Sequence, residues 1–219
     1  MKKKILTFLS VLFLSLLFYS VPQAAIITFD DVITGETSYS FDGDGDGIND
    51  VIFSTTDPAG FNTVGPGQYM NFINEPGLEG SSELNQDLRV DFLNGAVTNI
   101  SFGFALDSYT EDDFASFSLY NSGNVNLGNM SVTGYYTELS SGIDSSFPEG
   151  FLSMNFSGIA SYGIFNFTSD YGRYIIDNFQ GTFGSTEDIN PIPEPSSLIL
   201  LGIGILTLSG WIRSSGRKQ

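Results

Sequence analysis

The chain of 219 residues carries 25 acidic side chains against 8 basic ones, for a formal net charge of −17, and it contains no cysteine and no histidine. These absences exclude a Ser-His-Asp triad, a thiol nucleophile, disulfides and metal sites built from imidazole or thiolate. The negative charge argues against nucleic acid or anionic lipid as a partner, because both are bound by clustered Lys and Arg.

The basic residues are concentrated at the two ends of the chain. Six of the eight lie at positions 2–4, 213, 217 and 218. Between Ala25 and Asn190 the chain has 24 acids and two basic residues, Arg89 and Arg173, and therefore a net charge of −22. This distribution predicts three parts, namely an N-terminal segment (1–25), one acidic domain (26–189) and a C-terminal segment (190–219).

The N-terminal segment has the order of features of a secretory signal peptide. Lys2–Lys4 precede the apolar run Ile5–Phe18, and Pro22 is followed by the small residues Ala24 and Ala25. We therefore predict a signal peptide over residues 1–25, with cleavage after one of the two alanines. A retained N-terminal anchor is the alternative.

The C-terminal segment joins a proline-rich stretch to an apolar run and a basic tail. Leu198–Ile212 contains 15 apolar or small residues, fewer than the roughly 20 that span a bilayer, although the preceding serines can extend the span. Arg213 and the two basic residues beyond it favour a cytoplasmic location for the C-terminal end of this span. The segment thus predicts a single transmembrane helix with the acidic domain across the membrane.

This tail resembles the PEP-CTERM sorting signal of Gram-negative bacteria. The matching residues are Pro193-Glu194-Pro195, the glycine-containing apolar span and the terminal Arg and Lys residues. The resemblance implies recognition by an exosortase, a membrane-embedded cysteine protease, after export through the inner membrane. The helix would anchor the chain transiently, and its removal would leave the domain at the cell surface or in an extracellular polysaccharide matrix. A plain tail anchor is the alternative.

The middle of the chain predicts an all-β fold, a jelly-roll-like β-sandwich. Short runs alternate apolar and polar residues, as in Ala115–Tyr120, and Gly, Asn, Asp and Ser separate them. Asn94-Gly95 lies between two such runs and predicts a hairpin turn. Phe and Tyr supply the bulk of the strand residues, as strands prefer.

The first and last expected strands each place an aspartate on an apolar face. In Ile27–Asp31 and in Ile175–Phe179, period-2 alternation puts Asp31 and Asp177 beside buried positions, where a lone carboxylate is costly. These two segments resemble the terminal strands of carbohydrate-binding-module sandwiches, and the resemblance implies that they pair near a structural calcium. The alternative is that both aspartates lie at strand ends in water.

A run of alternating Asp and Gly is the strongest chemical motif in the domain. Carboxylates at relative positions 1, 3 and 5 let one loop direct three oxygens at a cation, and glycine at position 6 permits the reversal. The run resembles the calcium loop of EF-hands and dockerins, with a carbonyl at position 7 and an acid at position 9. The predicted Ca²⁺ ligands are Asp42, Asp44, Asp46, Ile48 and Asp50. Hard oxygen ligands in this number favour Ca²⁺ over Zn²⁺ or Mg²⁺.

The loop departs from the EF-hand at its end. Position 12 is Phe53 instead of a bidentate Glu, and the flanks, Thr37–Phe41 and Val51–Thr55, predict strands instead of helices. The Ile48 side chain is expected to be able to pack inward. This pattern suits a weak extracellular site that orders the connection between two strands. The alternative is a solvated hairpin tip without an ion.

Three classes of function remain open. The first is a non-catalytic surface or matrix protein. The second is a carbohydrate-binding module for exopolysaccharide, for which the candidate stacking residues are Tyr109, Tyr120, Tyr135 and Tyr136. The domain has no Trp, the best stacking surface, which weakens this class. The third is a glycoside hydrolase that uses two carboxylates, although no motif isolates a pair among 24 acids.

Overall fold

The protein was analysed as a computed structural model that describes residues 23–43, 45–63, 69–74, 76–81 and 88–183. These residues form ten strands and no helix, and hence no helix that could cross a membrane. The strands are β1 Gln23–Ile27, β2 Ser38–Phe41, β3 Val51–Ser54, β4 Leu78–Ser81, β5 Arg89–Leu106, β6 Phe114–Tyr120, β7 Asn126–Thr133, β8 Glu149–Asn155, β9 Ala160–Phe167 and β10 Arg173–Phe183. The all-β prediction is confirmed. Most of the signal peptide and the whole sorting segment lie outside the described residues.

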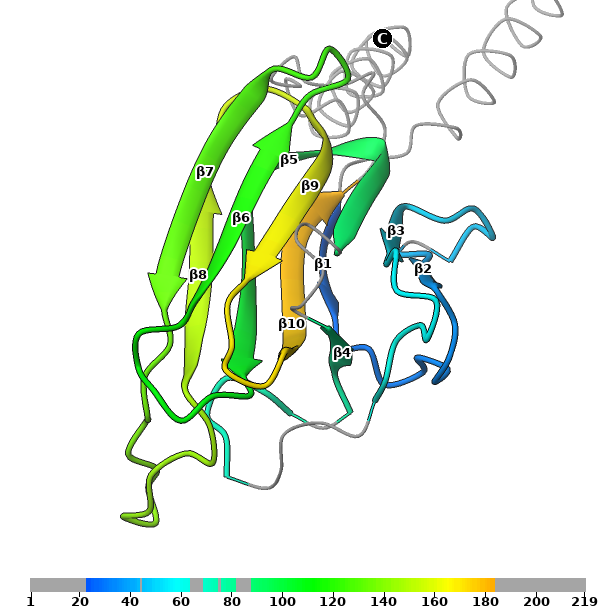
Figure 1. Ribbon diagram of the computed structural model, residues 1–219. Coiled ribbons are helices and arrows are strands. Elements are labelled where there is room, and N and C mark those ends of the chain that lie inside the picture. Colours follow the sequence, from blue (N-terminus) through cyan, green and yellow to red (C-terminus); the bar gives the residue numbers. More distant parts are fainter. Residues whose placement is uncertain (1–22, 44, 64–68, 75, 82–87, 184–219) are drawn as a thin grey trace, which may run out of the picture. The chain divides into compact units, whose positions relative to one another are not determined.

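The strands form two antiparallel layers that share β5 (Figure 1). One layer has the order β2-β3-β5-β9-β6-β7 and uses the first half of β5. The other uses the second half, which pairs with β8 on one side and β10 on the other, while β1 and β4 pair with β10. Together the layers make an open sheet folded into a sandwich.

The long strand β5 changes layers at the dipeptide that was expected to form a hairpin. Gly95 has φ +81°, Thr98 has φ +70°, and the pairing with β9 shifts register between Asp91 and Ala96. Ala96 pairs with both β9 and β10. The hairpin prediction is wrong because the two halves of β5 bend apart to join different partners instead of pairing with each other. A glycine in a strand interior often marks such a bend.

The core between the layers is made largely of phenylalanine. Phe53, Phe117 and Phe165 come from the first layer and are fully buried, as are Phe102 and Phe179 from the second. Ring centroids lie 5.1 Å apart in the Phe53–Phe179 and Phe102–Phe165 pairs, with interplanar angles of 89° and 62°. Edge-to-face pairs of this kind add to the burial energy of the rings. The period-2 patterns therefore predict the core correctly.

A bulge in β10 changes the expected position of Asp177. Asn178 has φ +52°, and the pairing with β5 shifts register between Asp177 and Gln180. Phe179 therefore lies in the main core, whereas Ile175 belongs to a separate cluster on the outer face. The expectation that Ile175, Asp177 and Phe179 share one face is wrong, because an extra residue in a strand reverses the alternation beyond it.

The first strand pairs with the last, as predicted. Ile27 lies opposite Phe179 in the antiparallel pair of β1 with β10. Alternation is lost just after β1, where Phe29 is buried with φ +57°. Asp31 is consequently exposed, and its Oδ1 accepts a hydrogen bond of 2.8 Å from the Tyr39 hydroxyl. The interior position expected for Asp31 is therefore wrong, and its carboxylate lies in solvent.

Two buried carboxylates fix residues 69–74 against the second layer. Glu149 is completely buried, and its oxygens accept the N–H groups of Asn71 and Phe72 at 2.8–2.9 Å. Asp177 is 1% exposed, and its Oδ2 accepts the N–H of Asn74 at 2.7 Å. A Cβ added at Gly103 would lie 2.1 Å from the Phe72 carbonyl oxygen, so the close approach requires glycine there.

We predict that the phenylalanine core dominates stability. Phe165→Ala removes a ring that contacts both layers and should lower the free energy of unfolding by about 3–5 kcal/mol. Phe151→Ala is the matched control: Phe151 is 42% exposed, and its loss should be about 1 kcal/mol or less. Denaturant unfolding of the full chain measures both values. Equal losses would contradict this account of the core.

We also predict a pH dependence that originates at Asp177. Burial raises the pKa of Asp177 to about 6. Because the folded state then holds the proton more tightly than the unfolded chain, this contribution to stability is complete below pH 4 and is lost as the pH rises through 6. The difference in unfolding free energy between wild type and Asp177→Asn should therefore fall by about 1–2 kcal/mol between pH 4 and 7.

An exposed aspartate provides the control for this titration. Asp112→Asn removes the same functional group at an exposed position and controls for the general effect of losing one charge. Parallel stability curves for wild type and Asp177→Asn would contradict the assignment.

Candidate functional site

The aspartate loop joins β2 to β3, so both strand flanks predicted for it are confirmed. Gly45 and Gly47 have φ of +73° and +87°, which fits the glycine required for the reversal. The carboxylate of Asp42 closes the loop on itself: Oδ1 accepts the Gly45 N–H at 2.7 Å and Oδ2 accepts the Gly47 N–H at 2.8 Å.

Two further loop carboxylates also accept backbone N–H groups. Asp46 Oδ1 accepts from Ile48 at 2.7 Å, and Asp50 Oδ2 accepts from Gly43 at 2.9 Å. The Ile48 side chain is 62% exposed, so the inward packing expected of it is wrong. Asp44 lies outside the described residues. Among those described, no three acidic side chains are arranged to hold a metal ion, and calcium binding remains a prediction.

Tyr120 is one of the predicted stacking residues, and neighbouring side chains already cover the rings around it. Its ring stacks on Tyr162 at 5.0 Å and 13°, and the Arg89 guanidinium carbon lies 4.1 Å from the Tyr162 centroid. Arg89 is itself held by a bidentate ion pair with Asp91. The Tyr162 ring is thus contacted by Tyr120 from β6 and by Arg89 from β5, which reduces the ring surface left for a ligand.

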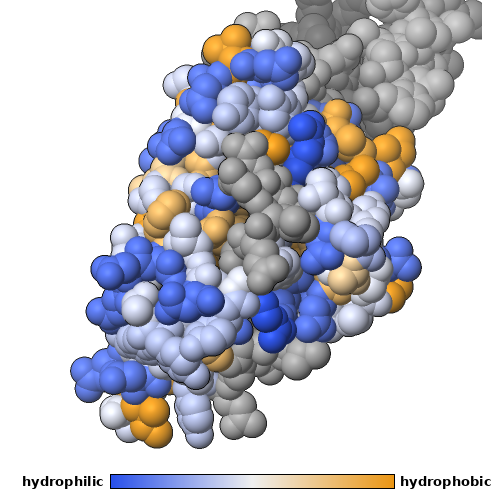
Figure 2. Space-filling model, viewed as in Figure 1, coloured by the Kyte–Doolittle hydropathy of each residue, from blue (hydrophilic) through white to orange (hydrophobic). Residues whose placement is uncertain are grey.

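The surface around this tyrosine stack is polar. β6 and β9 present Ser116, Ser118 and Asn166 there, and Asn129 of β7 donates to the Ser118 hydroxyl. Figure 2 shows hydrophobic residues on this side of the molecule as small, separate patches among polar ones. The described residues drawn in colour in this view therefore form no continuous apolar surface.

Tyr135 and Tyr136 contribute to packing around the ends of the strands. The Tyr135 ring lies 6.4 Å from that of Phe72 at 75°, and Tyr135 pairs with Glu149 through a β-bridge. Tyr136 is half-buried, and its hydroxyl donates to the Ser108 carbonyl oxygen at 3.3 Å. Both rings are held by the protein itself, and neither is as accessible as Tyr109.

Tyr109 forms an open aromatic pair with Tyr171, a residue that the sequence analysis missed. The two side chains are 74% and 51% exposed. Their ring centroids lie 4.9 Å apart at 81°, an edge-to-face pair. In this geometry each ring leaves at least one face uncovered by the other. The pair joins residues 62 positions apart, which explains why neither local pattern indicated it.

Hydrogen bonds between two loops hold the tyrosine pair in place. Asp170 Oδ2 accepts the Tyr109 N–H at 3.2 Å and the Ser108 hydroxyl at 3.0 Å. The Tyr171 N–H donates to the Asp107 carbonyl at 3.1 Å. The Asp107 N–H donates in turn to the carbonyl of Arg173, so residues 107–109 and 170–173 form one unit.

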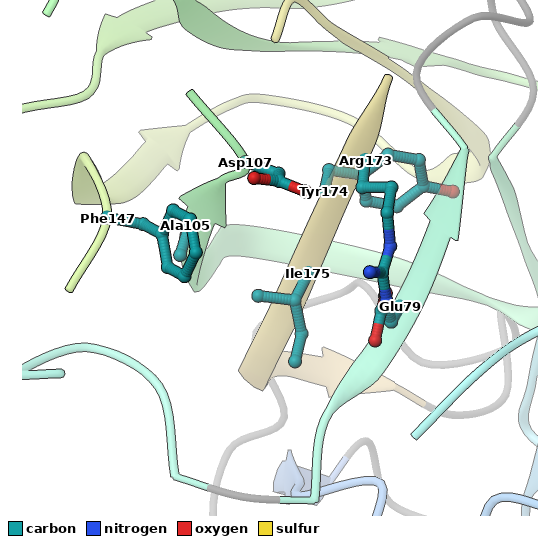
Figure 3. Close-up of a pocket in the computed structure, with 7 residues that line it drawn as sticks. All are labelled: Glu79, Ala105, Asp107, Phe147, Arg173, Tyr174 and Ile175. Carbon is teal, nitrogen blue, oxygen red and sulfur yellow. The ribbon is translucent and has the colours of Figure 1, made fainter. Parts of the chain in front are cut away.

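A pocket lies next to this unit on the outer side of the second layer. Its lining residues are Glu79, Ala105, Asp107, Phe147, Arg173, Tyr174 and Ile175. Figure 3 shows the Arg173 side chain extending towards Glu79, with Phe147 and Ala105 on the other side of the β10 ribbon. Asp107 and Arg173 belong to both the pocket and the loop unit, so the pocket borders the loops that carry the two tyrosines.

The charges in the pocket are largely paired. Glu79, whose side chain is 5% exposed, forms an ion pair with Arg173. Burial raises the pKa of Asp107. The pocket therefore offers the Asp107 carboxylate and the Glu79–Arg173 ion pair as hydrogen-bonding groups.

The sequence also matches a known sorting signal. Residues 191–214 match the model of the PEP-CTERM protein-sorting motif. The chain carries a PEP-CTERM sorting motif. The matched range includes Pro193, Glu194 and Pro195, all of which lie outside the described residues. The motif indicates export and a C-terminal membrane-anchored sorting signal. A comparison with curated proteins finds no match.

Several solved β-rich domains are similar to the chain. The K2 adhesin domain of Lys-gingipain, a protein of Porphyromonas gingivalis, has 16% identity and a TM-score of 0.42, over 74% of this chain and 98% of that domain. TmCBM27, a mannan-recognising carbohydrate-binding module, has 12% identity and a TM-score of 0.40, over 76% of this chain and 99% of that module. The catalytic domain of a GH87 alpha-1,3-glucanase has 12% identity and a TM-score of 0.39, over 80% of this chain but 30% of that one.

Proposed function

We propose that this protein is a non-catalytic component of the cell surface or of an extracellular polysaccharide matrix, delivered there by an exosortase. The PEP-CTERM motif at residues 191–214 is the observation that carries the proposal. In this scheme residues 1–25 direct export through the inner membrane, and a helix within 190–219 holds the chain until the protease removes it. The jelly-roll-like sandwich is the part that remains.

The chemistry of the domain supports a non-catalytic role. The sequence has neither His nor Cys, so acid–base or covalent catalysis would depend mainly on carboxylates. A glycoside hydrolase uses two carboxyl groups in different roles, and no motif isolates such a pair among the 24 acids of the domain. Binding to polysaccharide is the second candidate function, favoured by the exposed Tyr109–Tyr171 pair.

The proposal includes a structural calcium at the loop between β2 and β3. The loop is rich in oxygen donors, and two of its glycines have the positive φ values required by the reversal. Its carboxylates repel one another in a domain with few basic residues, and a divalent cation would neutralise them. Calcium would order the connection without taking part in a reaction. The proposed ligands are the side chains of Asp42, Asp44, Asp46 and Asp50 and the Ile48 carbonyl.

The sorting proposal predicts a shortened mature protein. In a host with an exosortase, the exported product should lack residues 198–219, because the apolar span and basic tail are removed. Replacing Pro193, Glu194 and Pro195 with alanine should leave the tail attached. Intact-mass analysis of membrane and extracellular fractions measures both products.

A residue just before the matched range provides the control. Asn190→Ala lies outside residues 191–214 and should still be processed. Exported wild-type protein that retains Lys218, or identical processing of the triple variant, would contradict the sorting proposal.

The calcium proposal predicts a stabilised chain. Calcium at about ten times its Kd should add about 1.4 kcal/mol and raise Tm by about 3–6 °C relative to a chelator. Asp42→Asn combined with Asp46→Asn should abolish the increase, because two ligands lose their charge. Thermal unfolding of the full chain, with Mg²⁺ in parallel, measures the effect.

Asp57→Asn is the matched control for this pair of substitutions. Asp57 also accepts a backbone N–H within its own turn, from Ala59 at 2.8 Å, but lies outside the aspartate loop. Its calcium response should equal that of the wild type. If the wild-type chain has the same Tm with calcium and with chelator, the proposed calcium site is wrong.

A further inference from the structure

We infer that the Tyr109–Tyr171 pair and the adjoining pocket form a binding site for an uncharged polysaccharide. The inference rests on the proposed function only in that the polymer is one met outside the cell. Four observations carry it, namely the accessibility of the two rings, the rigidity of their backbones, the hollow beside them and the charge around them.

The two rings supply the surface that a sugar requires. A pyranose presents an apolar C–H face that packs on an aromatic ring, and tyrosine adds a polar hydroxyl at the edge. Tyr109 and Tyr171 are the exposed aromatic pair, with centroids 4.9 Å apart at 81°. The rings at right angles make a corner, so one sugar residue can pack on a ring face while its neighbour in the polymer meets the other ring.

The backbone of each tyrosine is fixed before any ligand binds. Asp170 accepts the N–H of Tyr109, and the Asp107 carbonyl accepts the N–H of Tyr171. Gly172 is buried with φ +72° and its N–H donates to the Ser169 carbonyl, which closes the turn that presents Tyr171. Loops held in this way lose little conformational entropy on binding, which favours affinity.

The pocket extends the platform with hydrogen-bonding groups. Asp107 is shared by the loop unit and the pocket, and the half-exposed Arg173 guanidinium lies across the hollow beside β4. Carboxylate and guanidinium groups bind sugar hydroxyls as acceptor and donor. The site thus combines open aromatic faces with a few oriented polar groups, as small-molecule sites usually do.

The surrounding charge selects against acidic polymers. Residues 107–113 and 169–173 contain five acids and one basic residue, the latter paired with Glu79. A uronate-containing or sulfated chain would be repelled at this surface. An uncharged chain avoids that repulsion, so neutral polysaccharide is the class of ligand that the site fits.

Co-sedimentation tests the inference directly. The full chain, purified in mild detergent, is mixed with insoluble glucan, mannan and galactan, and with alginate gel as the acidic polymer. Retention on at least one neutral polymer and none on alginate is expected. Tyr109→Ala and Tyr171→Ala should each weaken association by about tenfold, and the double variant should abolish it.

Three further variants keep the test falsifiable. Tyr109→Phe retains the ring and should keep most of the binding, and Tyr171→Leu retains apolar bulk but should lose it. Tyr120→Ala removes a tyrosine at the other end of β6 and should bind as the wild type does. Thermal unfolding shows that each variant is folded.

The outcomes separate this site from the sorting proposal. Lack of binding to every neutral polymer, binding to alginate alone, or retained binding by a folded double variant would overturn the site. None of these results bears on tail removal, because the assay uses purified chain. Conversely, a chain that binds glucan but keeps its tail in the host would support the binding site and contradict the sorting proposal.

Discussion

The domain must hold its buried carboxylates almost without basic side chains. Both of its arginines are already in ion pairs, Arg89 with Asp91 and Arg173 with Glu79. The remaining buried acids accept backbone N–H groups instead: Glu149 binds those of Asn71 and Phe72. A charge-assisted hydrogen bond to a backbone N–H satisfies the carboxylate and fixes the donor segment together. In this protein the acids therefore determine the loop conformations.

The same interaction recurs at three other loops. Asp177 fixes Asn74, and Asp50 fixes Gly43 at the base of the aspartate loop. Asp170 fixes Tyr109. Loops would otherwise be the mobile part of a small all-β domain. Because hydrogen bonds anchor these loops, residues that project from them keep defined positions. Tyr109 is held by the Asp170 carboxylate and Tyr171 by the Asp107 backbone carbonyl. The binding surface thus depends on the acidic composition.

The sequence predicts the parts of this structure that follow from local patterns. Alternation correctly places Val90, Phe102 and Phe117 in the core, and the Asp-Gly run correctly predicts a loop between two strands. The failures arise where one residue changes the backbone. Gly95 looks like a hairpin turn but bends one strand between two layers, since the choice depends on partners far away in the sequence.

The candidate site was only half predictable for a related reason. Tyr109 was identified as a stacking residue, but Tyr171 follows an Asp in a short turn that no periodic pattern marks. Its importance comes from the contact across two loops, which depends on the Asp107–Arg173 pairing at the end of β10. The bulge at Asn178 is similar: a single positive φ moves Asp177 to the outer face, and no alternation rule specifies it.

The high charge also constrains how such a domain can bind a polymer. Outside the cell, salt screens the field of the acids beyond roughly 8–10 Å, so the charge provides solubility more than long-range attraction. Close to the surface it opposes acidic chains. Attraction must then come from interactions at contact distance, namely ring stacking and oriented hydrogen bonds. These are individually modest, but a polymer meets many copies of a surface protein at once, and repeated weak contacts sum to firm retention. A corner of two tyrosines on an acidic loop surface, one fixed by a carboxylate and the other by a backbone carbonyl, suits that mode of attachment.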